Sequence, residues 1–344
     1  MKLLVKRSAL AGMGGFAAVI IAALLLSHET RSIGVFYLVF TAAFFLLNLL
    51  LFLPASKLRR RGAKGASVAL ICAANLVLAL GVSIYYLQEK MFFYPSNSVD
   101  CSEQMQTEPA FRKVAVTAKD GTKLSGWLRI NSKSEKAPLV LYFGGNGQNS
   151  SKTFTNFLKN GTFADFAGYN AMMVDYRGYG YSQGKPDDKT MFSDALDVYD
   201  YAVKQPYTDP AHVVPVGYSI GTGEAVYLAS QRPAAGLVLI APYYSGRDLY
   251  NSMVNIFYGP MTGLIRYQFD SERYAPLVKC SPLVFTSKTD EMISWRQSEA
   301  LSKRFPAGAK LEYISGATHE TYFKSKVMTD NLRDYLTKTG EASK

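Results

Sequence analysis

The stretch from Val213 to Gly223 reads Val-Val-Pro-Val-Gly-Tyr-Ser-Ile-Gly-Thr-Gly, and Ser219 stands at the centre of its Gly-x-Ser-x-Gly motif. A β-branched run precedes the motif, and a run compatible with a helix follows it at 224–229. Strand, sharp turn and helix in this order are the setting in which such a serine becomes a nucleophile. The two flanking glycines leave room for a strained turn that lifts the serine oxygen above the end of a sheet. A Gly/Ser turn without chemistry is the alternative interpretation.

Composition and charge divide the chain of 344 residues into two parts. Residues 8–87 hold long apolar runs, whereas the remainder has the composition of a globular domain. Residues 1–89 carry nine Lys and Arg against two Asp and Glu, so they contribute +7 of the net charge of +11. A nucleic-acid-binding protein would need a basic face on its folded domain, and this distribution argues against one. It fits basic segments that flank a membrane.

Three uncharged apolar segments lie at 8–27, 33–53 and 67–87. Each is close to the roughly 20 residues that an α-helix needs to cross a bilayer, so we expect three transmembrane helices. A signal peptide is the alternative for the first segment, because basic residues precede it. Three buried helices of a soluble protein are the alternative for the whole region.

Loop charge predicts the orientation of these segments. Lys and Arg gather in residues 1–7 and again in residues 57–64, whereas the loop between the first two segments has only Arg31. Basic loops remain on the cytoplasmic side, so we expect a cytoplasmic N-terminus. After three crossings, the chain from Glu89 onward is expected outside the cytoplasm.

We expect three regions along the chain: a membrane domain at 1–88, a linker at 89–110 and a catalytic domain at 111–338. The linker contains Phe92-Phe93-Tyr94-Pro95. These aromatic residues suit a membrane–water interface, or they pack under the globular domain.

Strand-like and helix-like runs alternate in the C-terminal region. An antiparallel pair is expected at 111–117 and 123–130 around the turn Lys-Asp-Gly-Thr. Alternating strands and helices predict an α/β fold with a mostly parallel sheet and helices on both faces. Further strands are expected at 138–143, 169–176, the elbow strand from 213, 237–241, 283–287 and 310–314, and helices at 152–159, 188–204, 294–305 and 321–337.

A serine hydroxyl needs a base beside it, and the chain offers three histidines. His28 lies between two predicted membrane segments, and His212 stands at the far end of the elbow strand from Ser219. Only His319 directly follows a strand, the last one. In a parallel sheet the active site lies at the carboxyl ends of the strands, so we assign His319 as the general base and acid.

A carboxylate must hold the tautomer of that histidine. Asp290 follows the preceding strand, and Ser219, Asp290 and His319 then stand in the chain order Ser, Asp, His. Glu291 and Asp248 are the alternatives. Asp175 also ends a strand, where a role in anchoring a loop is expected.

Acyl transfer also needs hydrogen-bond donors for the oxyanion. One expected donor is the backbone N–H of Ile220, the residue after the nucleophile. The other is the N–H of Asn146, in the loop Gly144-Gly145-Asn146-Gly147 that follows a predicted strand. An ordinary strand-to-helix turn is the alternative for this loop.

Residues from about Glu89 to Tyr335 resemble the α/β-hydrolase superfamily, and within it the membrane-anchored serine hydrolases that include protein depalmitoylases. The chain departs from that family at two places: Gly144-Gly145 and Thr286-Ser287 stand where the family usually has His-Gly. The resemblance rests on Phe92-Phe93-Tyr94-Pro95, Gly144-Gly145-Asn146-Gly147, Asp175-Tyr176-Arg177-Gly178-Tyr179-Gly180, Gly217-Tyr218-Ser219-Ile220-Gly221, Asp290 and Gly316-Ala317-Thr318-His319.

Residues 243–274 lie between two strands, where this fold commonly places a cap, and they are rich in Met and aromatic residues. Such a segment lines a pocket for an acyl chain, touches the bilayer, or only packs on itself. Of the three cysteines, Cys101 and Cys280 would pair only if the domain faces an oxidising compartment.

Together these features predict a membrane-anchored serine hydrolase that cleaves an ester or thioester with an apolar acyl group. The expected partners are a small-molecule, lipid or acylated substrate and a membrane, with no nucleic acid. No cofactor and no metal is expected. An aminopeptidase or amidase of the same fold is one alternative, and a membrane scaffold without catalytic activity is another.

Overall fold

The computed structural model describes residues 81, 85–86, 88–89, 92–95, 102–131 and 136–341. The first two predicted transmembrane segments and most of the third lie outside these residues, as do His28 and Cys101. No helix within the described part of the chain is long and apolar enough to cross a membrane. The described residues from 85 onward belong to one compact unit.

A single sheet organises the larger unit. Its strands are β1 Phe111–Thr117, β2 Lys123–Arg129, β3 Ala137–Phe143, β4 Asn170–Val174, β5 Thr208–Tyr218, β6 Val238–Ile240, β7 Leu283–Thr286 and β8 Lys310–Tyr313. They lie in the order β1-β2-β4-β3-β5-β6-β7-β8. β2 pairs antiparallel with β1 and β4, and the other neighbouring strands pair in parallel. The predicted α/β fold with a mostly parallel sheet is confirmed.

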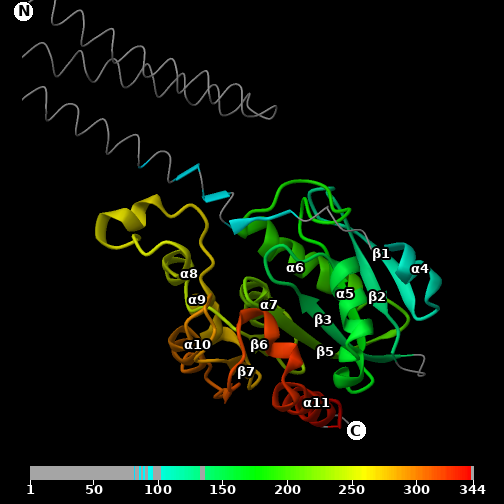
Figure 1. The fold of residues 1–344 in the computed structure, drawn as a ribbon. Coiled ribbons are helices and arrows are strands. Elements are labelled where there is room, and N and C mark those ends of the chain that lie inside the picture. The colour runs from blue at the N-terminus through cyan, green and yellow to red at the C-terminus, as the bar shows by residue number, and fades with distance from the viewer. Residues whose placement is uncertain are drawn as a thin grey trace, which may run out of the picture. The chain divides into compact units, whose positions relative to one another are not determined.

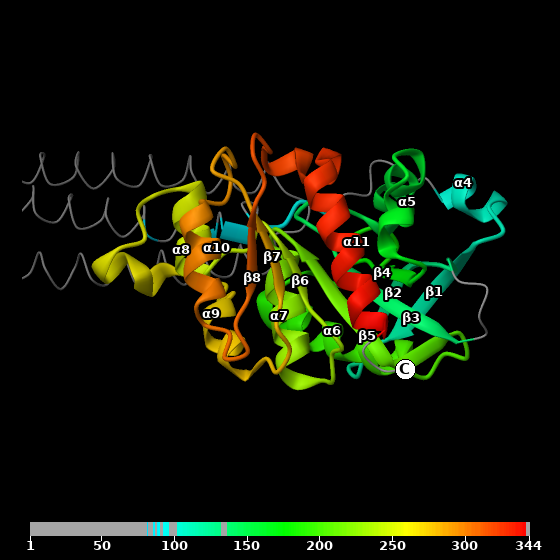
Figure 2. The same ribbon diagram turned by 90° about the horizontal axis from the view of Figure 1, so that it is seen from below.

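Helices cover both faces of this sheet (Figures 1 and 2). Strand side chains alternate between the faces: Val140 and Tyr142 of β3 pack toward one face, Leu139 and Leu141 toward the other. The first face is covered by α5 Ser150–Lys159 and α11 Lys326–Glu341, and the second by α6 Asp188–Ala202, α7 Gly221–Gln231 and α10 Trp295–Ser302.

The central strands are apolar on both sides because both faces are buried, which explains their continuous apolar sequences. Leu139, Val140 and Leu141 are all fully buried. Truncating one of these leucines to alanine would leave a cavity and cost about 2–5 kcal/mol. The core therefore fixes the ends of β3 and β5, from which the site is built.

Most expected elements are found with ends that differ by a few residues, and three larger differences follow. β5 begins at Thr208, so His212 lies within the strand and not before it. The expected helix at 321–337 is a 3-10 turn, η4 His319–Lys324, followed by α11, because Ser325 between them has an extended backbone (φ −82°, ψ 118°). A short helix that the sequence did not predict, α4 Ser102–Thr107, precedes β1.

The region expected to form a cap contains α8 Gly246–Met253, the 3-10 turn η2 Gly259–Leu264 and the short helix α9 Ser271–Tyr274. Phe92 and Phe93 pack under this region. The ring of Phe92 lies 4.2 Å from that of Tyr250 and 5.9 Å from that of Phe269. Of the two interpretations for these aromatic residues, packing against the globular domain is the one observed.

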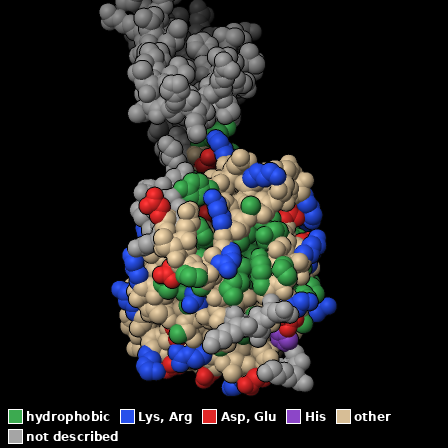
Figure 3. Space-filling model, turned by 90° about the vertical axis from the view of Figure 1, so that its right-hand side faces the viewer, with side chains coloured by type: hydrophobic (Ala, Val, Ile, Leu, Met, Phe, Trp, Pro, Cys, Tyr) green, Lys and Arg blue, Asp and Glu red, His purple; other side chains and the backbone are tan. Residues whose placement is uncertain are grey.

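α8 and the chain that follows it lie on the opposite side of the domain from β1 and α4 (Figures 1 and 2). Figure 3 shows the face on the β1 side, where hydrophobic side chains gather in the middle and Lys, Arg, Asp and Glu side chains lie around them.

Candidate active site

Ser219 lies directly after β5, in a backbone conformation that side chains rarely adopt. Its φ is +55°, in the left-handed region, which costs a non-glycine residue about 1–2 kcal/mol. Neighbouring bonds hold it there: the Ser219 N–H donates to the Ile240 carbonyl at 2.9 Å, and the Thr222 hydroxyl donates to the Ser219 carbonyl at 2.6 Å. The turn therefore has the strained geometry expected of a nucleophile elbow.

The two motif glycines are needed because β5, α7 and the loop after β3 approach one another closely. A Cβ on Gly217 would lie 2.6 Å from the Gly221 carbonyl oxygen, and a Cβ on Gly221 would lie 2.3 Å from the Phe143 carbonyl oxygen. At both positions a side chain would therefore clash with neighbouring backbone atoms. This explains why the motif has glycine on each side of the strained serine.

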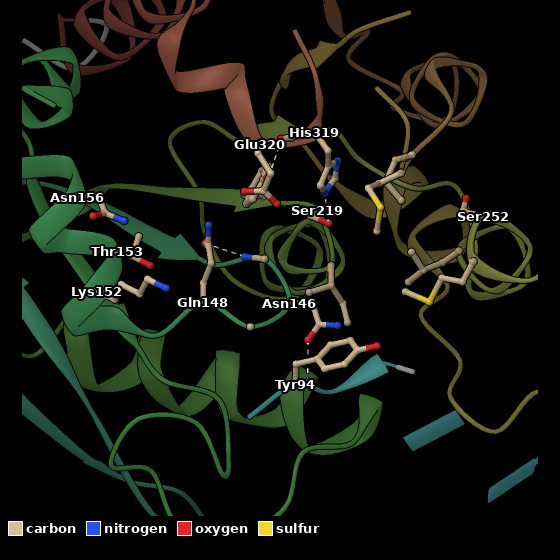
Figure 4. Close-up of a pocket in the computed structure, with 18 of the residues that line it drawn as sticks. Tyr94, Asn146, Gln148, Lys152, Thr153, Asn156, Ser219, Ser252, His319 and Glu320 are labelled. Carbon is tan, nitrogen blue, oxygen red and sulfur yellow. Dashed lines mark hydrogen bonds between the residues drawn. The ribbon is translucent and has the colours of Figure 1, made fainter. Parts of the chain in front are cut away.

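The three residues assigned from the sequence are hydrogen bonded in series. The Oγ of Ser219 lies 2.9 Å from Nε2 of His319, and Nδ1 of His319 lies 3.0 and 3.1 Å from the two carboxylate oxygens of Asp290. All three follow the carboxyl ends of parallel strands, β5, β7 and β8. Figure 4 shows Ser219 and His319 facing one another at the centre of a pocket.

Asp290 is held by three further donors. Its Oδ1 accepts from the N–H groups of Met292 and Ile293, both at 2.9 Å, and its Oδ2 accepts from the Tyr322 hydroxyl at 3.0 Å. Burial acts to raise the pKa of this carboxyl. The hydrogen bond and charge of His319 and the two backbone donors outweigh burial, so the pKa of Asp290 is lower than its ordinary value.

The backbone of His319 is fixed as well as its ring. Its N–H donates to Oε2 of Glu291 at 3.2 Å, and its carbonyl accepts from the Tyr218 hydroxyl at 2.6 Å. The ring of Tyr218 also stacks on the imidazole, with centroids 5.3 Å apart and planes inclined by 29°. Glu291, an alternative for the acid, therefore binds the backbone of the histidine and not its ring.

The loop after β3 is braced by side chains from two directions. The N–H of Gly145 donates to Oε1 of Gln148 at 3.0 Å, and the Tyr176 hydroxyl donates to the Gly144 carbonyl at 2.8 Å. A Cβ on Gly144 would lie 2.9 Å from the same Gln148 oxygen. Gln148 therefore occupies space that a larger residue at position 144 would need, which accounts for the departure from His-Gly.

Asn146 is anchored by its side chain. Its Oδ1 accepts from the Tyr94 N–H at 3.0 Å and from the Tyr179 hydroxyl at 2.9 Å. No hydrogen bond from the backbone N–H of Asn146 or Ile220 is found among the described residues. Both residues line the pocket beside Ser219, so both N–H groups are available to a ligand there.

The pocket is a cleft of about 690 Å³ whose two halves differ in chemistry. Figure 4 shows Ser219 and His319 between them, with α5 on one side and Ser252 of α8 on the other. The α5 side is mainly polar, with Phe157 as an exception, and the α8 side is mainly apolar, with Ser252 as an exception. The polar half contains Gln148, Lys152, Thr153, Asn156 and Glu320, and the apolar half contains Leu249, Met253, Val254, Met292 and Ile293.

The remaining candidates lie away from this pocket. His212 is bonded to Asp209, with Nδ1 2.6 Å from Oδ2. Ser245 caps the start of α8 by accepting from the Asp248 N–H at 3.2 Å, and its hydroxyl donates to Oδ2 of Asp248 at 2.5 Å. Asp175 accepts from the Ser150 N–H, in agreement with the predicted loop-anchoring role.

Cys280 is a free thiol whose pKa is raised to about 11 by burial. No group of three or more His, Cys, Asp and Glu side chains within the described ranges is placed to hold a metal ion.

Sequence reasoning missed the supporting residues Tyr218, Gln148 and Tyr322. Tyr218 occupies the variable position of the motif, and Gln148 lies just after the glycine-rich loop, so neither has a chemical signature of its own. It also missed Glu224, whose carboxylate is fully buried in α7 and has no hydrogen-bond partner for either oxygen among the described residues. Burial raises the pKa of Glu224 to about 8.

Comparison with known proteins gives three concordant results. A family model described as the alpha/beta hydrolase fold matches residues 138–274. An uncharacterised protein of Mycobacterium tuberculosis is 28% identical over 277 residues, which cover 80% of this chain and 94% of that protein. Protein bem46 of Schizosaccharomyces pombe is 24% identical over 283 residues, covering 76% of this chain and 91% of that protein.

Among solved structures, an esterase of Pyrococcus furiosus superposes with a TM-score of 0.55 at 17% identity, over 72% of this chain and 96% of that one. That likeness concerns the fold. With the strand order and the family model, it leads to one conclusion: the C-terminal domain of this chain has the α/β-hydrolase fold, and residues 138–274 match the model of that family.

Proposed function

We propose that this protein is a membrane-anchored serine hydrolase that cleaves an ester or thioester bearing an apolar acyl group. The observation that carries the proposal is the hydrogen-bonded series from Ser219 through His319 to Asp290. The left-handed serine and two unpaired backbone N–H groups beside it supply the other parts that acyl transfer requires.

In this mechanism the Oγ of Ser219 attacks the carbonyl carbon while Nε2 of His319 takes the serine proton. The negative charge that develops on the carbonyl oxygen is stabilised by the N–H groups of Ile220 and Asn146. Asp290 keeps the imidazole in the required tautomer and stabilises its charged form. Collapse of the intermediate expels an alcohol or thiol, which receives the proton from His319. Water, activated by the same imidazole, then attacks the acyl-enzyme and releases the carboxylic acid.

The two halves of the cleft support the substrate class. An acyl chain on the α8 side would meet Leu249, Met253 and Ile293, and each methylene buried there contributes about 0.8 kcal/mol, or about fourfold in kcat/KM. A polar leaving group on the α5 side would meet hydrogen-bonding side chains and the ammonium group of Lys152. Such a division suits a molecule that is apolar on one side of the scissile bond and polar on the other.

We further propose that residues 8–27, 33–53 and 67–87 cross the membrane and place the catalytic domain outside the cytoplasm. The uneven distribution of Lys and Arg around these segments supports this topology. Reporter fusions after Leu53 and after Leu87 test it. The first crossing leads outward, the second returns and the third leads outward again, so the fusion after Leu53 should report the cytoplasm and the fusion after Leu87 an extracytoplasmic position. The opposite pair of results would contradict this topology.

The activity is tested with the full-length protein in detergent, using esters and thioesters of increasing acyl length and a peptide p-nitroanilide. Hydrolysis that rises with acyl length and disappears in Ser219→Ala is the expected result. Preferential cleavage of the anilide would indicate an aminopeptidase or amidase instead. A wild-type protein that hydrolyses nothing and does not react with a serine-directed probe would indicate a scaffold without catalytic activity.

A further inference from the structure

The chain between α8 and α9 carries an exposed apolar surface. From Leu249 to Ile265 the sequence has no Lys, Arg, Asp, Glu or His. Within this stretch Val254, Ile256 and Tyr258 are 40%, 38% and 57% exposed. Exposed apolar side chains gathered in one uncharged segment indicate an interaction site more often than scattered ones do. We call residues 254–265 the apolar lip.

The lip is tied to the residues that follow the third predicted membrane segment. Nε2 of Gln88 donates to the Leu264 carbonyl at 2.7 Å, and Oε1 of Gln88 accepts from the Arg266 N–H at 2.8 Å. The side chain of Gln88 is fully buried by these contacts. The guanidinium of Arg266 also lies 5.6 Å from the ring centroid of Tyr85 and 3.4 Å from a carboxylate oxygen of Glu89.

These contacts fix where the lip must lie if residues 67–87 cross a bilayer. The predicted segment ends at Leu87, so Gln88 is at the point where the chain leaves the hydrocarbon layer. The side chain of Gln88 is hydrogen bonded to Leu264 and to Arg266, so the C-terminal end of the lip lies at the same depth as Gln88. Tyr and Arg, here Tyr85 and Arg266, are residue types that favour the membrane–water interface.

The lip also borders the cleft. Val254 begins the lip and lines the apolar half of the cleft together with Met253 and Leu249 of the preceding helix. Gln297 of α10 holds α8 in this position, because its Nε2 donates to the Ser252 hydroxyl at 2.8 Å. Val254 therefore belongs both to the exposed lip and to the lining of the cleft that holds the serine.

We propose that the apolar lip contacts the surface of the bilayer, and that the acyl chain of a membrane-embedded substrate passes from the bilayer over the lip into the apolar half of the cleft. The membrane contact goes beyond the proposed function, whereas the route of the acyl chain rests on the proposed function. A bilayer is the occupant that the anchoring by Gln88 favours, because that contact places the lip next to a predicted membrane segment.

The contact is tested by tryptophan quenching in the full-length protein, reconstituted in phosphatidylcholine vesicles whose acyl chains are brominated near the headgroup. Ile256→Trp places the probe on the lip, and Val327→Trp places a matched probe on α11, where Val327 is 57% exposed. Leu78→Trp, within the third predicted membrane segment, is the positive control. The fluorescence of the two native tryptophans is measured on the wild-type protein and subtracted from that of each variant.

The proposal expects strong quenching of Ile256→Trp and Leu78→Trp and none of Val327→Trp. Equal, weak quenching at 256 and 327 with strong quenching at 78 overturns it, since the domain is then anchored but the lip is in water. Absence of quenching at 78 also overturns it, because the predicted anchor is then missing.

The acyl route is tested by placing a charge on the lip. Ile256→Asp and Tyr258→Asp should leave hydrolysis of soluble p-nitrophenyl acetate unchanged and lower hydrolysis of a long-chain ester embedded in vesicles by about tenfold, since a carboxylate resists transfer into the interface. Val327→Asp is the control. Equal loss on both esters, or on neither, contradicts the route. Inactivity of the wild-type protein on both esters contradicts the proposed function instead, and the quenching result still decides the membrane contact.

Discussion

The ring of Tyr218 stacks on the imidazole of His319, and its hydroxyl donates to the carbonyl oxygen of the same residue at 2.6 Å. Tyr218 immediately precedes Ser219, so one side chain connects the nucleophile turn after β5 to the histidine loop after β8. The burial of Tyr218, with the nearby charges of Glu320, Asp290 and Glu291, raises the pKa of its phenol, which therefore remains a donor. The distance from Ser219 to His319 depends on this connection.

Tyr218→Phe keeps the ring and removes the donor. A hydrogen bond of this kind contributes about 0.5–1.5 kcal/mol, so kcat should fall by about two- to thirteenfold with little change in KM. Steady-state kinetics on a short ester measure both constants. Tyr313→Phe, on a side chain that is 43% exposed, is the matched control and should behave as the wild type. An unchanged kcat in Tyr218→Phe would mean that stacking alone positions the histidine.

Asp290→Asn should lower kcat by about 10³–10⁴-fold, because an amide stabilises the wrong imidazole tautomer and cannot balance an imidazolium charge. Tyr322→Phe, which removes one donor to the carboxylate, should cost far less. Comparing the two variants in one assay separates the effect of the carboxylate charge from the effect of the Tyr322 hydrogen bond that holds the carboxylate. A small effect of Asp290→Asn together with a large effect of Glu291→Gln would reassign the acid to Glu291.

The lowered pKa of Asp290 also predicts a pH dependence of stability. Because the folded-state pKa lies below the ordinary value of 3.8, the carboxylate contributes stability that is fully present above that value and is lost as pH falls through the folded-state pKa. Thermal unfolding of the wild type and Asp290→Asn should therefore converge in acid and differ at neutral pH. If the difference in stability between the two proteins stayed constant down to the lowest pH, folding would not lower the pKa of Asp290.

Gln148→Ala should impair the oxyanion loop. The variant leaves the Gly145 N–H without its acceptor and opens space beside Gly144, so the Asn146 N–H is less well aimed. We expect kcat to fall about tenfold, a part of the 10²–10³-fold that loss of a whole oxyanion donor costs. Asn156→Ala, which changes another residue of the polar half, is the control. Equal kinetics for the two variants would remove Gln148 from the catalytic account.

Glu224→Gln should change how stability depends on pH. The folded-state pKa of about 8 exceeds the ordinary 4.5, so the folded protein keeps a proton that the unfolded chain loses, and the free energy of unfolding falls as pH rises between these values. The slope is about 1.4 kcal/mol per pH unit. The glutamine variant lacks this slope, so its melting temperature relative to the wild type should rise between pH 5 and pH 8. Parallel curves of melting temperature against pH for the two proteins would mean that a hydrogen-bond partner stabilises the charged form of Glu224 in solution.

The layered fold and the relative order of the site residues could be predicted because each depends on local sequence. Buried strands are continuously apolar, and Ser219, Asp290 and His319 each follow one of them. The start of β5 could not be predicted, since Asp209 and Pro210 are uncommon in strands. They lie where the register between β3 and β5 shifts, between the pairs Ala137–Thr208 and Leu139–Val213. Likewise, Tyr218 and Gln148 act through contacts with residues distant in sequence or with the loop backbone, and only the folded structure brings these groups together.

The central claim is that Ser219 is the nucleophile of this protein. The most direct test is labelling of the full-length protein by a fluorophosphonate, with Ser219→Ala and Ser245→Ala, which changes the buried serine that caps α8, compared at equal amounts of folded protein. If Ser219 is the nucleophile, one label per chain is expected in the wild type and in Ser245→Ala, and none in Ser219→Ala. Undiminished labelling of Ser219→Ala would contradict it.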